Sequence, residues 1–93
     1  MWQVYGIFEK KTGDCIYIGQ TRQALRNRWK WHLSWASVFN ESPVNIYMRK
    51  NGGYENFEIC CLKYGYKTKY DALEWESHYI MENEPKCNVR QYR

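Results

Sequence analysis

Glu76 is the residue whose type and position most strongly suggest chemistry. On a helix with about 100° per residue, it lies near the middle of an apolar face formed by Ala72, Leu73, Tyr79 and Ile80. A carboxylate directed at a hydrophobic core is costly unless it is paired, hydrogen-bonded or bound to a metal. Position 76 therefore predicts either a buried carboxylate paired with an arginine or a functional acid, and burial alone favours neither.

An earlier helical segment supplies an arginine and a histidine that could accompany this acid. Arg28 lies at the edge of that segment's apolar face, and His32 follows one turn later on the same side. Each has an ordinary explanation, since an arginine can extend along apolar surface and a histidine on such a face is usually a packed core residue. Tyr5 and Tyr17 lie on two neighbouring predicted strands, where tyrosines usually serve packing. The combination of all five types favours a functional site.

The elements that must position these side chains follow the order β-β-α-α-β-α. Two short strands, residues 4–8 and 15–18, are joined by a polar connection that contains Gly13, which predicts a β-hairpin. A helix is expected from an N-cap at Thr21 to about Phe39, and a short one after Ser42 and Pro43, ending at residues 51–53. A third strand over 56–64 and a helix from Thr68 to about residue 83 complete an α+β fold with a small, largely antiparallel sheet.

Composition predicts one folded domain over residues 1–93, because so short a chain leaves no room for a second. Its aromatic content of 18% supplies large apolar side chains for a small core. Residues 1–50 carry eight Lys or Arg against three Asp or Glu, a net charge of +5, whereas residues 51–93 carry six against seven, a net charge of −1. The first half therefore suits a polyanionic partner, although mild basicity is common among small domains.

The cysteines and the apolar runs exclude several classes of protein. No C-x-x-C pair occurs, so a zinc site is not predicted, and the adjacent Cys60 and Cys61 are expected to pack as small hydrophobic strand residues. Nothing at the N-terminus resembles a signal peptide, so a disulfide framework is not expected. No run approaches the roughly 20 apolar residues of a membrane span. We therefore expect a cytoplasmic protein without a membrane partner.

Several short motifs occur in an order that points to a known family. Residues 4–21 read VYGIFEKKTGDCIYIGQT and contain a complete YIG at 17–19. Residues 26–32, RNRWKWH, resemble an R-W-x-x-H element, and residues 74–80, EWESHYI, resemble an E-x-x-[YW]-I element. Together with Tyr5 and Asn88, these motifs resemble the GIY-YIG nuclease superfamily over nearly the whole chain. Where the first motif normally reads Gly-Ile-Tyr, this chain has Gln-Val-Tyr over 3–5, which loses a flexible glycine at the strand start.

The resemblance implies a fold and a metal-dependent endonuclease activity. The implied fold is a three-stranded antiparallel sheet flanked by helices. Glu76 would hold one Mg²⁺, a hard cation that suits a carboxylate, several waters and a phosphate oxygen. Tyr5 would be the general base that activates water, as a phenolate stabilised by cationic surroundings. That role requires a pKa below the ordinary tyrosine value of about 10.

The resemblance also implies roles for the remaining site residues. Tyr17 and His32 would orient the water or the phosphate. Arg28 would neutralise charge that builds up on the phosphate in the transition state, a role suited to its planar fork. Asn88 stands at the asparagine that the family often carries near its end. The expected products are a 5′-phosphate and a 3′-hydroxyl.

Double-stranded DNA is the expected substrate by resemblance, while branched DNA and RNA remain open. Contacts to the backbone are expected from exposed cations that could equally be solvated surface: Arg22, Arg26, Lys30, Arg49 and Lys50. Trp31 and Trp35 could stack on bases, although rings in a small domain more often belong to the core. The chain supplies no separate DNA-binding region, so weak specificity, a homodimer or a separate targeting partner is expected.

Two other classes of function remain in competition. One is a non-catalytic nucleic-acid-binding module on the same scaffold, which would have no use for a core-facing acid beside an arginine. The other is a structural protein in which Glu76 and Arg28 form an ion pair that only sets packing. The response of stability and of cleavage to Glu76→Gln separates these alternatives.

Overall fold

The computed structural model describes residues 1–36 and 42–88, with residues 34–36 described by their backbone only. The elements follow the predicted order, with a short 3-10 turn before the third strand. Their bounds are β1 (Trp2–Glu9), β2 (Cys15–Thr21), α1 (Leu25–Ala36), α2 (Pro43–Lys50), η1 (Tyr54–Asn56), β3 (Phe57–Tyr66) and α3 (Lys69–Asn83). The α+β fold class predicted from the sequence is confirmed.

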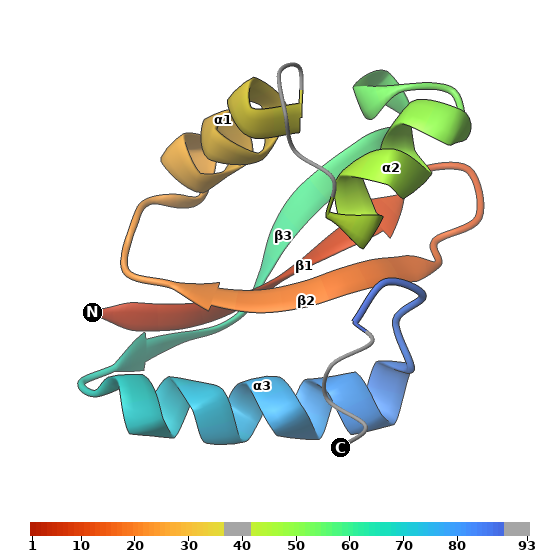
Figure 1. Cartoon of the computed structure of the whole chain (residues 1–93). Coiled ribbons are helices and arrows are strands. Elements are labelled where there is room, and N and C mark those ends of the chain that lie inside the picture. The colour runs from red at the N-terminus through yellow and green to blue at the C-terminus, as the bar shows by residue number, and fades with distance from the viewer. Residues whose placement is uncertain (37–41, 89–93) are drawn as a thin grey trace.

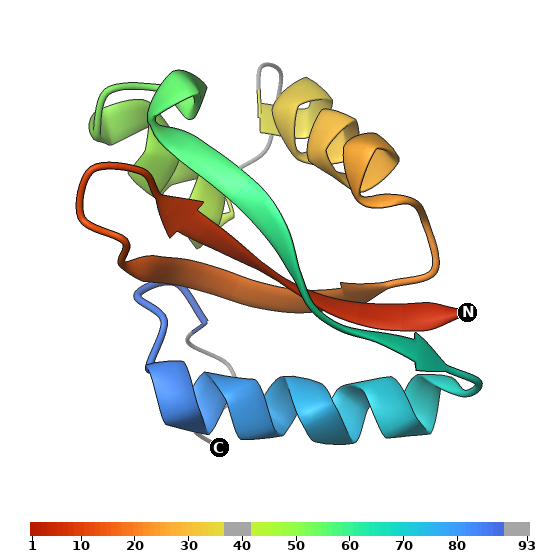
Figure 2. The same cartoon turned by 180° about the vertical axis from the view of Figure 1, so that it is seen from behind.

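The three strands form one antiparallel sheet in the order β2-β1-β3. β1 is the central strand, and residues 3–7 are buried in succession because neighbours cover both its edges and helices cover both faces. Figures 1 and 2 show α1 and α2 on one face of the sheet and α3 on the other. The sheet thus separates two layers of helices.

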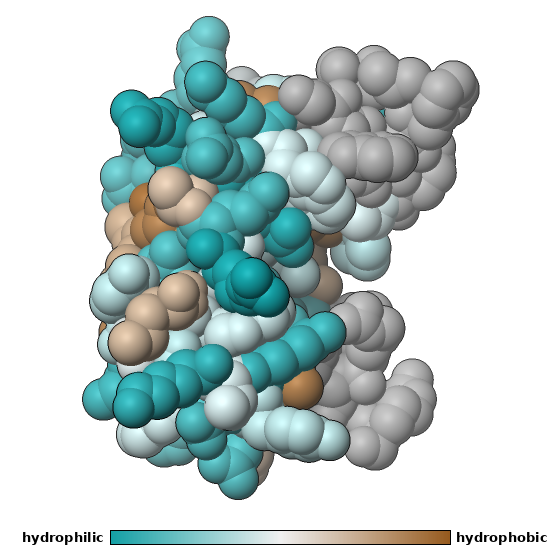
Figure 3. All heavy atoms as spheres, turned by 90° about the vertical axis from the view of Figure 1, so that its left-hand side faces the viewer, coloured by the Kyte–Doolittle hydropathy of each residue, from teal (hydrophilic) through white to brown (hydrophobic). Residues whose placement is uncertain are grey.

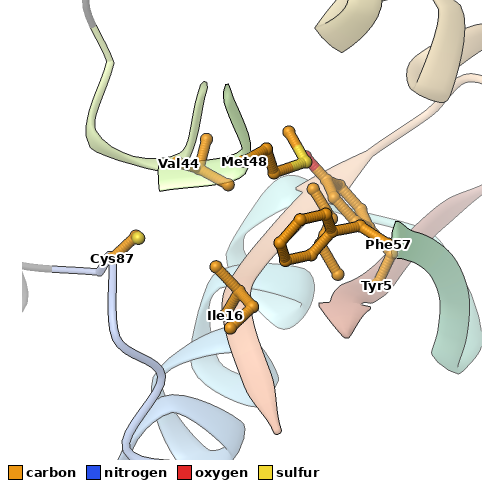
Figure 4. Packing of buried hydrophobic residues seen from close by; sticks show 7 residues of the cluster. Tyr5, Ile16, Val44, Met48, Phe57 and Cys87 are labelled. Carbon is orange, nitrogen blue, oxygen red and sulfur yellow. The ribbon is translucent and has the colours of Figure 1, made fainter. Parts of the chain in front are cut away.

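Each face of the sheet has its own cluster of buried side chains, since successive strand residues point to opposite faces. On the side of α1 and α2, β1 and β2 pack against α2, the start of β3 and the C-terminal segment (Figure 4), through Tyr5, Ile7, Ile16, Val44, Met48, Phe57 and Cys87. On the side of α3, the cluster is smaller and consists of Val4, Ile18 and Ile80. The strand that carries Tyr5 therefore contributes side chains to both layers.

The first helix begins later than the sequence predicts. Thr21 is not its N-cap: it is buried in β2 and pairs with Gln3 of β1. Its side-chain oxygen instead accepts a hydrogen bond of 3.0 Å from the backbone N–H of Gln23, a short turn that precedes α1. Pairing of Thr21 with the central strand β1 therefore extends β2 through a position where the residue type alone predicts a helix cap. The predicted end near Phe39 lies outside the described residues.

The other helix boundaries predicted from the sequence are largely confirmed. Pro43 occupies the first turn of α2 after Ser42, and Asn51 is its C-cap. Thr68 caps α3 by accepting a hydrogen bond of 3.2 Å from the backbone N–H of Asp71. The packing prediction for the cysteine pair is wrong for Cys61, which is exposed. Adjacent strand residues face opposite sides, and β3 lies at an edge of the sheet, so both thiols cannot enter one core.

No helix among the described residues is both long enough and apolar enough to span a membrane. α3, with fifteen residues from Lys69 to Asn83, carries charged side chains along its length. This agrees with the absence of a long apolar run in the sequence.

Candidate active site

The hydroxyl of Tyr5 joins the side chains of two different elements. Tyr5 is fully buried on the central strand. Nε of Arg28 donates a hydrogen bond of 3.1 Å to its oxygen, and Nε2 of His32 lies 3.1 Å from the same oxygen. Both partners come from α1 and are four residues apart, so one face of that helix presents them together. The structure thus brings three of the predicted site residues onto one oxygen.

His32 is a buried and uncharged member of this group. Only 3% of its surface is exposed. Burial first, and the positive charge of Arg28 second, lower the pKa of His32 from 6.5 to about 4, so the ring is neutral at pH 7. The ring lies edge-on to Tyr17 at 5.8 Å between centroids. Its Nδ1 has no hydrogen-bond partner within the described part of the chain. An unsatisfied buried nitrogen is costly and is typical of functional sites.

Trp31 supports Arg28 from the same helix. The guanidinium carbon lies 4.1 Å from the centroid of the Trp31 ring, a close cation–π contact. Trp31 is 38% exposed, so it is not the core residue that its ring type suggests by default. The spacing of three residues on a helix is the signal that could have found this contact in the sequence. The side chain of Trp35 lies outside the described residues.

The environment of Tyr5 opposes the phenolate that the resemblance implies. Burial is the main cause that raises the pKa of Tyr5 above its ordinary value of 10, and the neighbouring Tyr17 adds to it. The hydrogen bond and the charge of Arg28 act in the other direction without overcoming burial. The expectation that cationic surroundings lower this pKa is therefore wrong, because desolvation outweighs one guanidinium. Tyr5 is a neutral phenol at neutral pH in this structure.

Gly19 leaves the space that the Tyr5 hydroxyl occupies. The two residues pair across β1 and β2. A Cβ atom at position 19 would lie 2.7 Å from the Tyr5 hydroxyl and 2.9 Å from the ring of Tyr17. Distances below 3.0 Å do not occur for real Cβ atoms, so another residue would displace the two rings. The last position of the YIG motif must therefore be a glycine, because any side chain there would clash with the rings of Tyr5 and Tyr17.

Asn88 holds the outer edge of the strand that carries Tyr17. Its side-chain amide donates to the carbonyl of Ile18 and accepts from the Ile18 N–H, each at 2.7 Å. The backbone N–H of Cys87 donates to the carbonyl of Ile16 at 2.8 Å. The segment after α3 therefore satisfies backbone groups at the free edge of β2. Asn88 acts on the site through the backbone of β2.

Glu76 reaches the group from α3, on the other face of the sheet. Its side chain is half-buried, and Ala72 and Ile80, one turn before and after it, are buried. Its negative charge contributes to the raised pKa of Tyr5, which places the carboxylate within electrostatic reach of the hydroxyl. The acid predicted from the sequence thus lies near the tyrosine.

The donor set around Glu76 fits Mg²⁺ better than a metal held by a protein cage. Within residues 1–36 and 42–88, no group of three or more His, Cys, Asp or Glu side chains could hold a metal ion. Mg²⁺ usually keeps several waters and binds through one or two carboxylates together with substrate phosphate. A single half-buried carboxylate close to Tyr5 satisfies that requirement.

The predicted DNA-contact residues separate into two groups. Arg22, Arg26 and Lys30 are exposed on the β2–α1 connection and on α1, whereas Arg49 and Lys50 are exposed at the end of α2. Figure 1 shows the beginning of α1 and the end of α2 at opposite ends of the molecule. The two groups therefore lie on elements at opposite ends of the molecule.

Comparison with known proteins agrees with this fold. Residues 1–90 match the family model described as the GIY-YIG catalytic domain. The solved catalytic domain of the homing endonuclease I-TevI superposes with a TM-score of 0.77 at 22% identity, covering 95% of this chain and 94% of that one. No curated protein matches the chain. The chain belongs to the GIY-YIG catalytic domain family, a family of nucleases, and shares the fold of that solved domain.

Proposed function

We propose that this protein is a metal-dependent endonuclease that hydrolyses phosphodiester bonds in DNA. The observation that carries the proposal is the convergence of Arg28 and His32 on the Tyr5 hydroxyl, each at 3.1 Å, with Glu76 within electrostatic reach from the opposite layer. A binding module has no need for such a buried polar group, whose desolvation costs stability. Membership of a nuclease family supports the same conclusion.

Glu76 would hold the divalent cation, for which Mg²⁺ suits the single carboxylate. When bound, the cation would supply charge neutralisation at the scissile phosphate and at the leaving 3′-oxygen. Arg28, held by Tyr5 and by the Trp31 ring, presents a rigid fork of donors to the phosphate. The Tyr5 bond uses one of the five guanidinium donors. Because the guanidinium of Arg28 is held in place, it need not reorient when negative charge builds up on the phosphate.

Tyr5 and its neighbours would position the attacking water. As a neutral phenol Tyr5 offers a hydrogen bond that orients the water, and it would act as the general base only after losing its own proton. Tyr17 and His32 border the same hydroxyl and would keep bulk solvent away from it. Asn88 fixes the strand on which Tyr17 lies. Hydrolysis in this arrangement leaves a 5′-phosphate and a 3′-hydroxyl.

Cleavage of supercoiled plasmid tests the proposal. Wild type with Mg²⁺ should nick or linearise the plasmid, and EDTA or Glu76→Ala should abolish both products. Exposed Glu74 of the same helix provides the matched control, so Glu74→Ala should cleave as wild type does. A folded wild-type protein that shifts DNA in Mg²⁺ without cutting it would support the non-catalytic binding module instead.

Glu76→Gln separates the nuclease from a purely structural role. If the carboxylate serves the reaction, the amide should remove cleavage and leave the melting temperature unchanged or higher, because a half-buried charge has been removed. If the carboxylate only pairs with Arg28, the same change should lower the melting temperature by many degrees in the presence or absence of metal. Thermal unfolding with and without Mg²⁺ distinguishes the two.

A further inference from the structure

A tryptophan between two cations marks one end of the sheet. The Cζ atom of Arg22, just beyond β2, lies 5.7 Å from the centroid of the Trp2 ring. Nζ of Lys69, the first residue of α3, lies 5.9 Å from the same centroid. Lys67 is exposed between β3 and α3, one residue after Tyr66, which pairs with Trp2. We call Trp2, Arg22, Lys67 and Lys69 the basic corner.

The basic corner carries charge that no described residue neutralises through an ion pair. Among the described residues, ion pairs join Lys86 to Asp14 and His78 to Glu82, and none involves Arg22, Lys67 or Lys69. Figure 3, which looks at this end of the molecule, shows a largely hydrophilic surface. The cation–π contacts hold Arg22 and Lys69 near the ring without neutralising their charge. A polyanion placed across the corner would neutralise that charge.

The corner lies on the line of the strand that leads from the candidate active site. The Tyr5 hydroxyl lies against Gly19 of β2, its partner across the sheet, and Arg22 follows Gly19 three residues later. At about 3.3 Å per residue, this separation is roughly 10 Å. One DNA strand advances about 3.4 Å along the helix axis for each nucleotide, so a duplex laid along β2 would place the corner roughly three nucleotides from the site.

We propose that the basic corner binds the DNA backbone roughly three nucleotides to one side of the scissile phosphate. Arg22 and Lys69 contact phosphates, and the Trp2 ring between them holds the two cations in place. The proposal rests on the proposed function, because it takes DNA as the polyanion. It adds Trp2, Lys67 and Lys69 to the DNA-contact surface. It also specifies that these residues bind the stretch of duplex on one side of the scissile phosphate. Arg49 and Lys50 lie at the other end of the molecule and do not belong to this surface.

The salt dependence of binding tests the corner without requiring cleavage. Wild type and the double variant Arg22→Gln with Lys69→Gln are titrated in EDTA against a duplex long enough to cover the whole protein, by fluorescence anisotropy over a range of salt. Each lost phosphate contact should reduce the slope of log K against log salt by about 1, so the double variant should lose about 2. Circular dichroism confirms that the variant is folded.

A matched variant removes the same charge elsewhere. Lys10 and Lys11 are exposed in the β1–β2 hairpin at the opposite end of the sheet. Lys10→Gln with Lys11→Gln should leave the slope unchanged. An equal loss in both double variants would show that only net charge matters, and an unchanged slope in the Arg22 and Lys69 variant would also overturn the proposal. Failure of wild type to bind the duplex at all would do the same.

The outcomes separate the corner from the catalytic proposal. Cleavage that depends on Glu76, together with an unchanged slope in the corner variant, would retain the nuclease and reject the corner. A reduced slope with no cleavage in Mg²⁺ would retain the corner on a binding module. Where cleavage occurs, duplexes with one arm shorter than about three base pairs should no longer distinguish the corner variant from wild type. Shortening the other arm should leave the difference intact.

Discussion

The layer under α1 and α2 buries hydrogen-bonding side chains, whereas the cluster under α3 is apolar. On the first side Tyr5 and His32 are buried with their polar atoms facing each other. On the second side the buried cluster consists of Val4, Ile18 and Ile80. Burial of polar groups costs free energy that apolar packing does not. The difference indicates that one layer is organised around chemistry and the other around holding the sheet.

α3 nevertheless carries Glu76, the acid of the proposed site. Glu76 is half-buried and influences Tyr5 across the sheet, although the outer face of α3 is exposed, with Tyr70 at 82%. The charge of Glu76 therefore couples the two layers at Tyr5. Substitutions in the two layers should differ in which property they change, stability or cleavage, and in how large the change is.

The largest contrast in stability is expected from the two histidines. His32 binds a proton with a pKa of about 4 when folded and 6.5 when unfolded, so the unfolded chain takes up more protons between these values. Stability should therefore fall as the pH drops from 6.5 through 4, by about 3 kcal/mol at about 1.4 kcal/mol for each pKa unit. Urea unfolding at pH 7 and pH 4 measures this loss.

Two variants assign that loss to the layer under α1. His32→Gln should show a much smaller difference between the two pH values than wild type. His78→Gln, on the exposed surface of α3, should retain the full difference. An equal pH dependence in wild type and His32→Gln would mean that other groups cause the acid sensitivity.

The two glycines that face opposite layers provide the next contrast. Gly19→Ala would press a methyl group against the Tyr5 hydroxyl, so it should cost about 1–3 kcal/mol and strongly reduce plasmid cleavage. Gly6→Ala on the α3 side would meet mainly the far end of the Phe8 ring, which is only half-buried and can move. It should cost less and retain cleavage. Equal losses of activity in both variants would contradict a site centred on the Tyr5 hydroxyl on the α1 side of the sheet.

The smallest effect is expected on the outside of α3. Tyr70→Ser removes a ring that is 82% exposed, so the free energy of unfolding should change by no more than about 0.5 kcal/mol. Cleavage should be unchanged as well. Denaturant unfolding and the plasmid assay together check this. A clear loss of either would show that this surface takes part in stability or in DNA contact.

Local sequence patterns determined most of the fold. The apolar runs of the first two strands, the Thr68 cap, the Pro43 start and the glycines after Asn51 are short-range signals, and each corresponds to an element or boundary of the structure. The order of elements and the three-stranded antiparallel sheet followed from these signals and from the family motifs. The helical spacing of Arg28 and His32 was also sufficient to place both on one side of α1.

Only the tertiary structure decided how these side chains meet. Thr21 is a reasonable helix cap by residue type, but it pairs with Gln3 and therefore belongs to β2. The pKa of Tyr5 is raised because desolvation by residues from several elements outweighs the one guanidinium beside it. Sequence spacing reports periodicity along one element, whereas burial and charge sum over elements that are distant in the chain. For that reason the site residues could be named from the sequence, while the protonation of the tyrosine required the folded protein.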